Sequence, residues 1–203
     1  MKNNYTEKEK QIFGGVLRLA KSGVDLSKIT AQQIADSAGV GKATIYDYFS
    51  SKEDIVQGAL LYSISAEAAR FRQAMADTPL FADKMGLIYG GIVSHTENTG
   101  SAFSLVLNSG HSFSPGRDNA CRFGSELKER IMEFIRILYD VLAAGYSQGV
   151  LAMDINNPRQ RDYVHMVLFG SLSATAQSAC RCAATDRSRV AENAYTMLVK
   201  ALN

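Results

Sequence analysis

Prolines and long apolar runs are scarce in this sequence. The first scarcity argues against a chain with many helix breaks, and the second argues against a membrane-spanning protein. Only three of the 203 residues are proline, and all three lie where helical patterns break. Few prolines, together with many Ala, Leu and Ile residues, favour an almost wholly helical chain. No apolar run reaches the roughly eighteen residues that a membrane helix needs. The start, MKNNYTEKEK, also lacks the apolar core of a signal peptide. We therefore expect a cytoplasmic protein with no membrane partner.

Metal-binding and redox-active side chains are also few. Cys121, Cys180 and Cys182 are an odd number of cysteines, which argues against a disulfide framework in a reducing compartment. Cys180 and Cys182 are two positions apart, so they point to different sides of a helix, and no CxxC pair or nearby histidine completes a metal site. We interpret them as small buried or half-buried residues. We expect no metal and no cofactor.

Catalytic motifs are missing as well. The sequence has no GxSxG, no glycine-rich phosphate loop and no paired carboxylates in a recognisable catalytic setting. An α-helical enzyme is therefore the least favoured function for this chain.

What is present is a stretch with the spacing of a helix-turn-helix, ITAQQIADSAGVGKATIYDYF at residues 29–49. Thr30 stands where an N-cap is needed. Ala35 is small where two helices must approach, and Gly39 follows where the chain leaves the first helix with positive φ. The second helix, at about 42–49, then has an outward face of polar and aromatic side chains that suits the DNA major groove. An ordinary helical corner is the competing interpretation.

The same stretch carries a resemblance to a known family. GVGKATIYDYF at 39–49, followed by SKEDI at 51–55, resembles the signature of the TetR family of bacterial transcriptional regulators. The resemblance covers roughly the first quarter of the chain, and the remainder matches only in length and helical character. It implies an N-terminal three-helix DNA-binding domain, at 1–52, and a C-terminal effector-binding and dimerisation domain, at 53–203.

Periodicity and breakers predict an all-α fold of about nine helices. The first spans about 6–22 and opens with a T-x-x-E capping box. After the two helices of the motif, a long helix from 51 to about 76 joins the domains, without a Gly/Ser-rich linker. Five further segments are expected at about 81–97, 100–109, 120–148, 159–182 and 187–202.

The resemblance assigns DNA contacts to Thr30, Gly41, Lys42, Ala43, Thr44, Tyr46, Asp47, Tyr48 and Lys52. Thr30 and Lys52 would hold phosphates, and Asp47 and Tyr48 lie where bases are read. For Tyr46 and Tyr48, packing against the core is an equally good explanation. Residues 1–54 contain eight Lys/Arg and seven Asp/Glu, so we expect a few local phosphate contacts rather than strong non-specific binding.

A small-molecule effector is expected in the C-terminal domain. The candidate lining residues are Phe71, Met75, Met85, Ile88, Tyr89, Ile92, His95, Phe103, Leu107, Phe123, Phe134, Leu138, Met166 and Gln177. They carry little charge, which favours an apolar or aromatic effector. For each of them singly, a place in the hydrophobic core is the competing interpretation.

A homodimer is expected because a palindromic operator needs two motifs related by a two-fold axis. The candidate interface residues are Tyr163, Val167, Leu168, Ser171, Leu172, Thr175, Ala179, Val190, Ala194 and Leu198. Closure of the monomer core is the alternative role for this stripe. Together these features predict a ligand-responsive regulator, most simply a repressor, that binds double-stranded DNA. An activator or architectural protein without an effector is the alternative.

Overall fold

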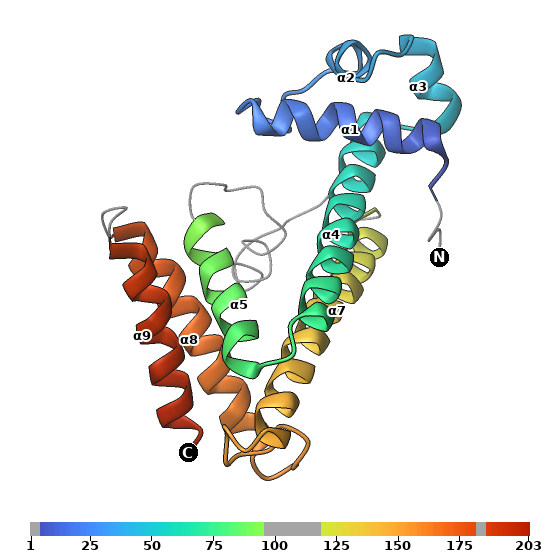
Figure 1. The fold of residues 1–203 in the computed structure, drawn as a ribbon. Coiled ribbons are helices and arrows are strands. Elements are labelled where there is room, and N and C mark those ends of the chain that lie inside the picture. Colours follow the sequence, from blue (N-terminus) through green and yellow to red (C-terminus); the bar gives the residue numbers. More distant parts are fainter. Residues whose placement is uncertain (1–4, 96–118, 182–185) are drawn as a thin grey trace. The chain divides into compact units, whose positions relative to one another are not determined.

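The computed structural model describes residues 5–95, 119–181 and 186–203, and every regular element in them is a helix (Figure 1). In chain order they are α1 (Glu7–Lys21), α2 (Ala31–Ala38), α3 (Lys42–Tyr48), α4 (Lys52–Asp77), α5 (Phe81–His95), α7 (Asn119–Ser147), α8 (Arg161–Arg181) and α9 (Arg187–Ala201). The predicted all-α fold is confirmed. These ranges contain eight helices rather than about nine, because the segment expected at 100–109 lies outside the described residues.

The helix limits follow from local capping. α1 begins after Thr6, whose Oγ1 accepts a hydrogen bond from the Glu9 amide at 3.2 Å, while the Glu9 carboxylate accepts one from the Thr6 amide at 2.8 Å. α4 begins after Ser51, whose hydroxyl accepts from the Asp54 amide at 3.1 Å. It continues to Asp77, just before Pro79. Within the described ranges, none of the helices combines the length and the apolar composition required to span a bilayer.

The chain divides into two compact units. The first comprises Met1–Glu67 and Ser114–Arg130, and the second comprises Ala68–Phe113 and Ile131–Asn203. The division falls within α4 and within α7, whereas the domain boundary predicted from the sequence falls at the start of α4.

The first unit has a core built mainly from α1, α2, α3 and the beginning of α4. It consists of Ile12, Phe13, Val16, Ile29, Ile34, Ala35, Ala38, Ile45, Ile55 and Ala59. The Phe13 ring is at its centre, with ring centroids 4.9 Å from Tyr5 and 5.4 Å from Phe49. Gly58 of α4 leaves room for this ring, because a Cβ at that position would lie 2.7 Å from Phe13 Cζ. This packing fixes the place of α3 through Ile45 and Phe49.

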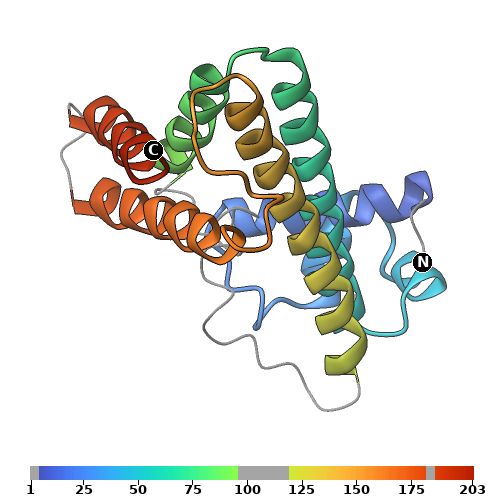
Figure 2. The same ribbon diagram turned by 90° about the horizontal axis from the view of Figure 1, so that it is seen from below.

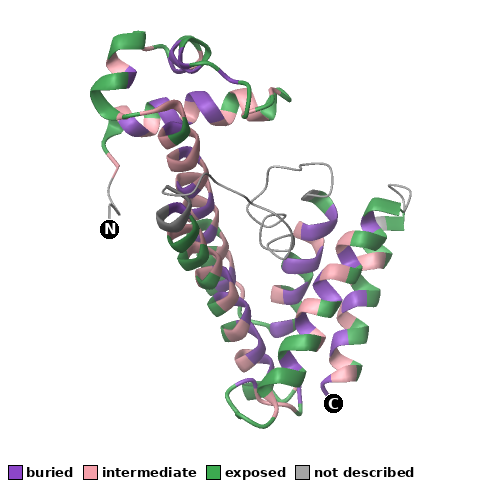
Figure 3. Cartoon of the chain, turned by 180° about the vertical axis from the view of Figure 1, so that it is seen from behind, coloured by how far each residue is buried: buried purple, intermediate pink, exposed green. Residues whose placement is uncertain are grey.

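The second unit is organised around α5, α8 and α9, which lie side by side (Figures 1 and 2). Their buried faces meet the C-terminal parts of α4 and α7 in one apolar cluster, and the outer faces are exposed (Figure 3). One polar contact crosses this interior: the Tyr89 hydroxyl is 2.7 Å from Ser171 Oγ. Burial is the main reason that the pKa of Tyr89 is raised to about 12.

Candidate nucleic-acid interface

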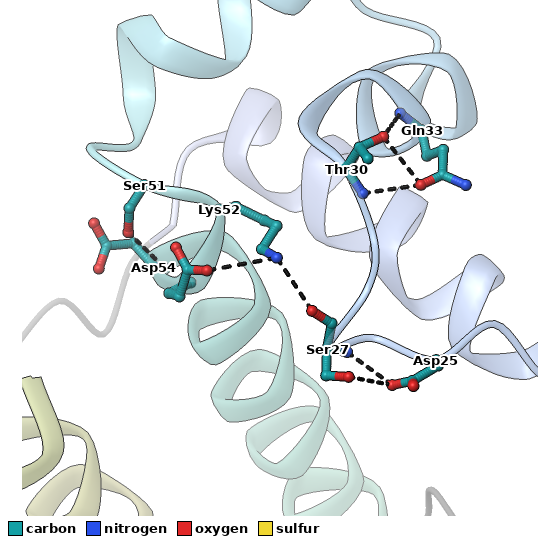
Figure 4. Close-up of polar contacts among 8 residues, drawn as sticks. Asp25, Ser27, Thr30, Gln33, Ser51, Lys52 and Asp54 are labelled. Carbon is teal, nitrogen blue, oxygen red and sulfur yellow. Dashed lines mark hydrogen bonds and ion pairs between the residues drawn. The ribbon is translucent and has the colours of Figure 1, made fainter. Parts of the chain in front are cut away.

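The turn between α2 and α3 has the geometry that the sequence predicted. Thr30 Oγ1 accepts from the Gln33 amide at 3.2 Å, and Gln33 Oε1 accepts from the Thr30 amide at 2.9 Å, so both ends of a capping box are present (Figure 4). At the other end of α2, Gly39 has φ +66°, a left-handed conformation that costs a glycine little. The Val40 amide then donates to Ala35 O at 3.0 Å, which closes the turn.

α2 is held tightly against α1. The hydroxyl of Ser37 donates to Gly15 O at 2.9 Å, and Gln11 Nε2 donates to Ala38 O at 2.9 Å. The guanidinium of Arg18 also donates to Ser37 O. A Cβ at Gly15 would lie 2.9 Å from the backbone nitrogen of Ala38, so the two backbones approach as closely as a glycine allows. α1 is therefore a rigid support for the helix pair.

α3 buries one side and exposes the other. Ile45 is fully buried in the core of the first unit, and Thr44 is half-buried. Lys42, Ala43, Tyr46, Asp47 and Tyr48 are exposed. Tyr46 and Tyr48 are 53% and 43% exposed, so neither residue is buried in the core of this unit.

The first turn of α3 has no side-chain cap. Gly41 is the N-cap residue, so no side-chain oxygen accepts from the first amides of the helix. Those amides are available to an acceptor from outside the chain. Of the residues assigned to DNA, six lie together on α3, namely Lys42, Ala43, Thr44, Tyr46, Asp47 and Tyr48, whereas Thr30, Gly41 and Lys52 lie outside it.

Lys52 ties the start of α4 to the loop before α2. Its Nζ donates to Ser27 O at 3.2 Å (Figure 4). The same Nζ lies 3.5 Å from a carboxylate oxygen of Glu53. Ser27 is itself held by Asp25, which accepts from the Ser27 hydroxyl at 2.7 Å. The hydroxyl and amide of Ser27 are the main reason that the pKa of Asp25 is lowered. Lys52 therefore stabilises the fold of this unit, a role that sequence reasoning missed, and its phosphate contact stays a prediction.

The candidate effector residues do not all come together. Those that share the apolar cluster of the second unit are Phe71, Met75, Met85, Ile88, Tyr89, Ile92 and Leu138, and Phe134 is buried next to Phe71, with ring centroids 5.9 Å apart. Met166 and Gln177 are instead exposed on α8, on the opposite side from its buried face. Phe103 and Leu107 lie outside the described residues, as does the side chain of His95.

Phe123 belongs to the first unit, where it lines a cavity of about 520 Å³. Tyr5, Tyr48 and Phe49 also line this cavity, together with residues of α4 and other residues of α7. Its walls come from four separate stretches of chain, so no local pattern in the sequence could have indicated it.

The candidate dimer stripe is mostly buried within the second unit. Leu168, Ser171, Leu172, Thr175, Ala179, Ala194 and Leu198 are all buried in the monomer. These seven residues pack within the core of a single chain, and their place in a dimer interface stays a prediction. Val167 and Val190 are half-buried, and Tyr163 is exposed, with its hydroxyl donating to Ala201 O at 3.2 Å.

Comparisons with known proteins agree with this geometry. Residues 24–59 match the family profile described as "Bacterial regulatory proteins, tetR family". The fold resembles that of the transcriptional regulator FadR from Bacillus subtilis in complex with stearoyl-CoA, at 18% identity over 96% of this chain and 99% of that one, with a TM-score of 0.64. It also resembles reduced NemR from E. coli, at 15% identity over 98% and 99% of the two chains, with a TM-score of 0.66. A TetR transcription regulator from Haloarcula marismortui is similar at 18% identity over 98% and 97%, with a TM-score of 0.57.

No curated protein sequence matches the chain at a significant level. The fold and the helix pair define the class of the protein, an all-helical transcriptional regulator with a helix-turn-helix for DNA binding. Residues 24–59 carry the motif of the TetR family, and the chain has the fold of TetR-family transcription regulators.

Proposed function

We propose that the protein is a cytoplasmic repressor that binds a palindromic operator as a homodimer and releases it when a small apolar or aromatic effector binds. The exposed face of α3, mounted on a rigid α1–α2 pair, is the observation that carries this proposal. Such a helix fits the major groove, and a two-fold pair of them fits successive grooves of a palindrome, about 34–36 Å apart. The first domain, at 1–52, would position this helix and the second, at 53–203, would control it.

The DNA contacts follow from the exposed surface. Lys42 and the uncapped amides that begin α3 would bind phosphate, with Thr44 at the same end of the helix. Tyr46 would contact the backbone through its hydroxyl, and Asp47 and Tyr48 would face the bases. Thr30 and Lys52 would add phosphate contacts at the edges of the motif.

The dimer would form through the exposed faces of α8 and α9 rather than through their buried stripe. Met166 is 64% exposed and Met197 is 47% exposed, and the positions one and two turns beyond Met166 are the exposed Gly170 and Ala174. Large apolar side chains beside small ones allow two helices to pack closely. This surface would be covered by a second copy of the same two helices.

The effector would enter the apolar interior between α5, α7 and α8, where Met85, Ile88 and Leu138 lie. The Tyr89–Ser171 hydroxyl pair is a polar group in this interior that would orient it, by exchanging one of its present hydrogen bonds for one to the effector. Stearoyl-CoA, the ligand of the FadR complex, is the first molecule to test because its acyl chain suits such an interior. An effector that binds one conformation of the dimer better than the other would shift the population away from the DNA-binding state.

The test is selection of bound DNA from a random pool, repeated with stearoyl-CoA and with a panel of flat aromatic compounds. We expect palindromes to be recovered and one class of ligand to abolish their recovery. Palindromes that persist with every ligand would favour the alternative, an activator or architectural protein without an effector. No retained DNA at low ionic strength would overturn the proposal.

A further inference from the structure

We propose that Asp47 selects cytosine at one fixed position of each operator half-site. Its carboxylate would accept a hydrogen bond from the cytosine N4 amino group. The inference rests on the proposed function, because it requires α3 to lie in the major groove. It goes further by naming a base that the operator must contain.

The environment of Asp47 in the free protein leaves its carboxylate available. Asp47 is exposed on α3, two residues beyond the buried Ile45, and it is the only acidic residue of the helix. Among the described residues it forms no hydrogen bond and no ion pair, whereas the nearby Asp54, Glu53 and Asp36 all have partners. Both of its oxygens are therefore free to accept.

A free carboxylate on this face has a cost in any complex with DNA. It approaches the phosphates, which repel it, and it loses water on entering the groove. The cost is offset only if the DNA presents a donor to it. Asp47 therefore discriminates between sequences even where it does not raise the overall affinity.

The donor is cytosine N4 rather than adenine N6 for a geometric reason. In the major groove guanine presents two acceptors, and thymine presents an acceptor and a methyl group. Adenine presents its N6 donor directly beside the N7 acceptor, which would face the second oxygen of a carboxylate. Cytosine presents a donor with no acceptor on its own edge, so it is the base that matches a group with two acceptors and no donor.

The test compares the wild-type protein with Asp47→Ala and Asp47→Asn in the same selection from random DNA. For the wild type we expect one position in each half-site to favour cytosine by roughly ten-fold or more, the scale of a single good base contact. Asp47→Ala should lose that preference while keeping the others. Asp47→Asn should move it towards adenine, because an amide can donate to N7 and accept from N6.

The outcomes separate this inference from the proposed function. If no variant retains DNA, both are overturned. If DNA is retained and the wild type and Asp47→Ala favour the same bases, only the role of Asp47 is overturned. If Asp47→Ala bound all DNA sequences more tightly by the same factor, the role of Asp47 would also be overturned, because the carboxylate would then act only by repelling phosphates. Asp47 is exposed and unpartnered, so unchanged circular dichroism spectra should confirm that both variants fold.

Discussion

At the scale of single residues, the buried phenol of Tyr89 links stability to pH. Its pKa of about 12 lies above the ordinary value of 10.0, so between these pH values the folded chain keeps a proton that the unfolded chain has lost. The contribution of Tyr89 to the free energy of unfolding is complete below pH 10 and is lost as pH rises through 12. It is lost because the unfolded state binds fewer protons than the folded state in this range. We expect a loss on the order of 2 kcal/mol over this window.

The measurement is the free energy of unfolding of wild type and Tyr89→Phe across the same pH range. Other tyrosines and lysines titrate in both proteins, so the difference between the two pH profiles isolates Tyr89. At neutral pH the variant should be less stable by about 1 kcal/mol, the value of one hydrogen bond. Parallel profiles above pH 10 would show that Tyr89 is not the source of the pH dependence.

Thr30 is a second residue, and its capping role can be measured separately from any contact with DNA. Its hydroxyl caps α2, and loss of such a cap costs about 1 kcal/mol. Thr30→Ala should lower the free energy of unfolding by that amount in the absence of DNA, and Thr30→Ser should keep it because serine provides the same oxygen. Urea denaturation measures both. An unchanged midpoint in Thr30→Ala would mean that the capping box does not contribute to stability.

At the scale of elements, the α1–α2 crossing depends on one glycine of an adjacent pair. Gly15 meets the backbone of Ala38, whereas a Cβ at Gly14 would meet only the far end of the Arg18 side chain at 3.4 Å. Gly15→Ala should therefore push α2 away from α1 and lower stability by about 1–3 kcal/mol, the usual cost of overpacking. DNA retention should fall with it, because α3 is carried by α2.

Gly14→Ala is the matched control on the same helix. Replacing a helical glycine with alanine should stabilise α1 by up to about 1 kcal/mol where space is available. Circular dichroism during urea denaturation compares the two variants directly. Equal stabilities would contradict the close approach of α1 and α2 at Gly15.

The elements also show which features a sequence can predict. The α2–α3 pair was predictable because its determinants are local: the cap at Thr30, the positive φ at Gly39 and the buried Ile45 all lie within sixteen residues of chain. The stripe on α8 was equally visible, because Leu168, Leu172 and Thr175 follow helical spacing. Periodicity identifies a buried face but not what covers it, and here α5 and α9 cover it. The effector candidates on α8 could not be sorted for the same reason, since residue type alone does not show that Met166 and Gln177 lie on its exposed face.

At the scale of the whole molecule, the dimer decides whether two copies of α3 can engage one operator. If the exposed face of α8 packs against a second copy, Met166 lies in that interface. Met166→Glu would then bury a carboxylate among apolar side chains, close to its two-fold mate, and removing one such charge from water costs several kcal/mol. We expect this variant to sediment as a monomer and to lose the palindromic operator, since a single motif binds only a half-site.

Met132→Glu is the control, because Met132 is 38% exposed on α7 beside the charged Lys128 and Arg136, on a face that resembles solvated surface. It should remain dimeric and retain DNA. Analytical ultracentrifugation over a concentration series distinguishes the two variants, and circular dichroism checks that both are folded. If Met166→Glu remained dimeric, the dimer interface would not lie on this face of α8. If the wild type were monomeric in solution and still recovered palindromes, the two copies would have to associate only on DNA. DNA binding would then rise steeply with protein concentration rather than follow a single-site binding curve.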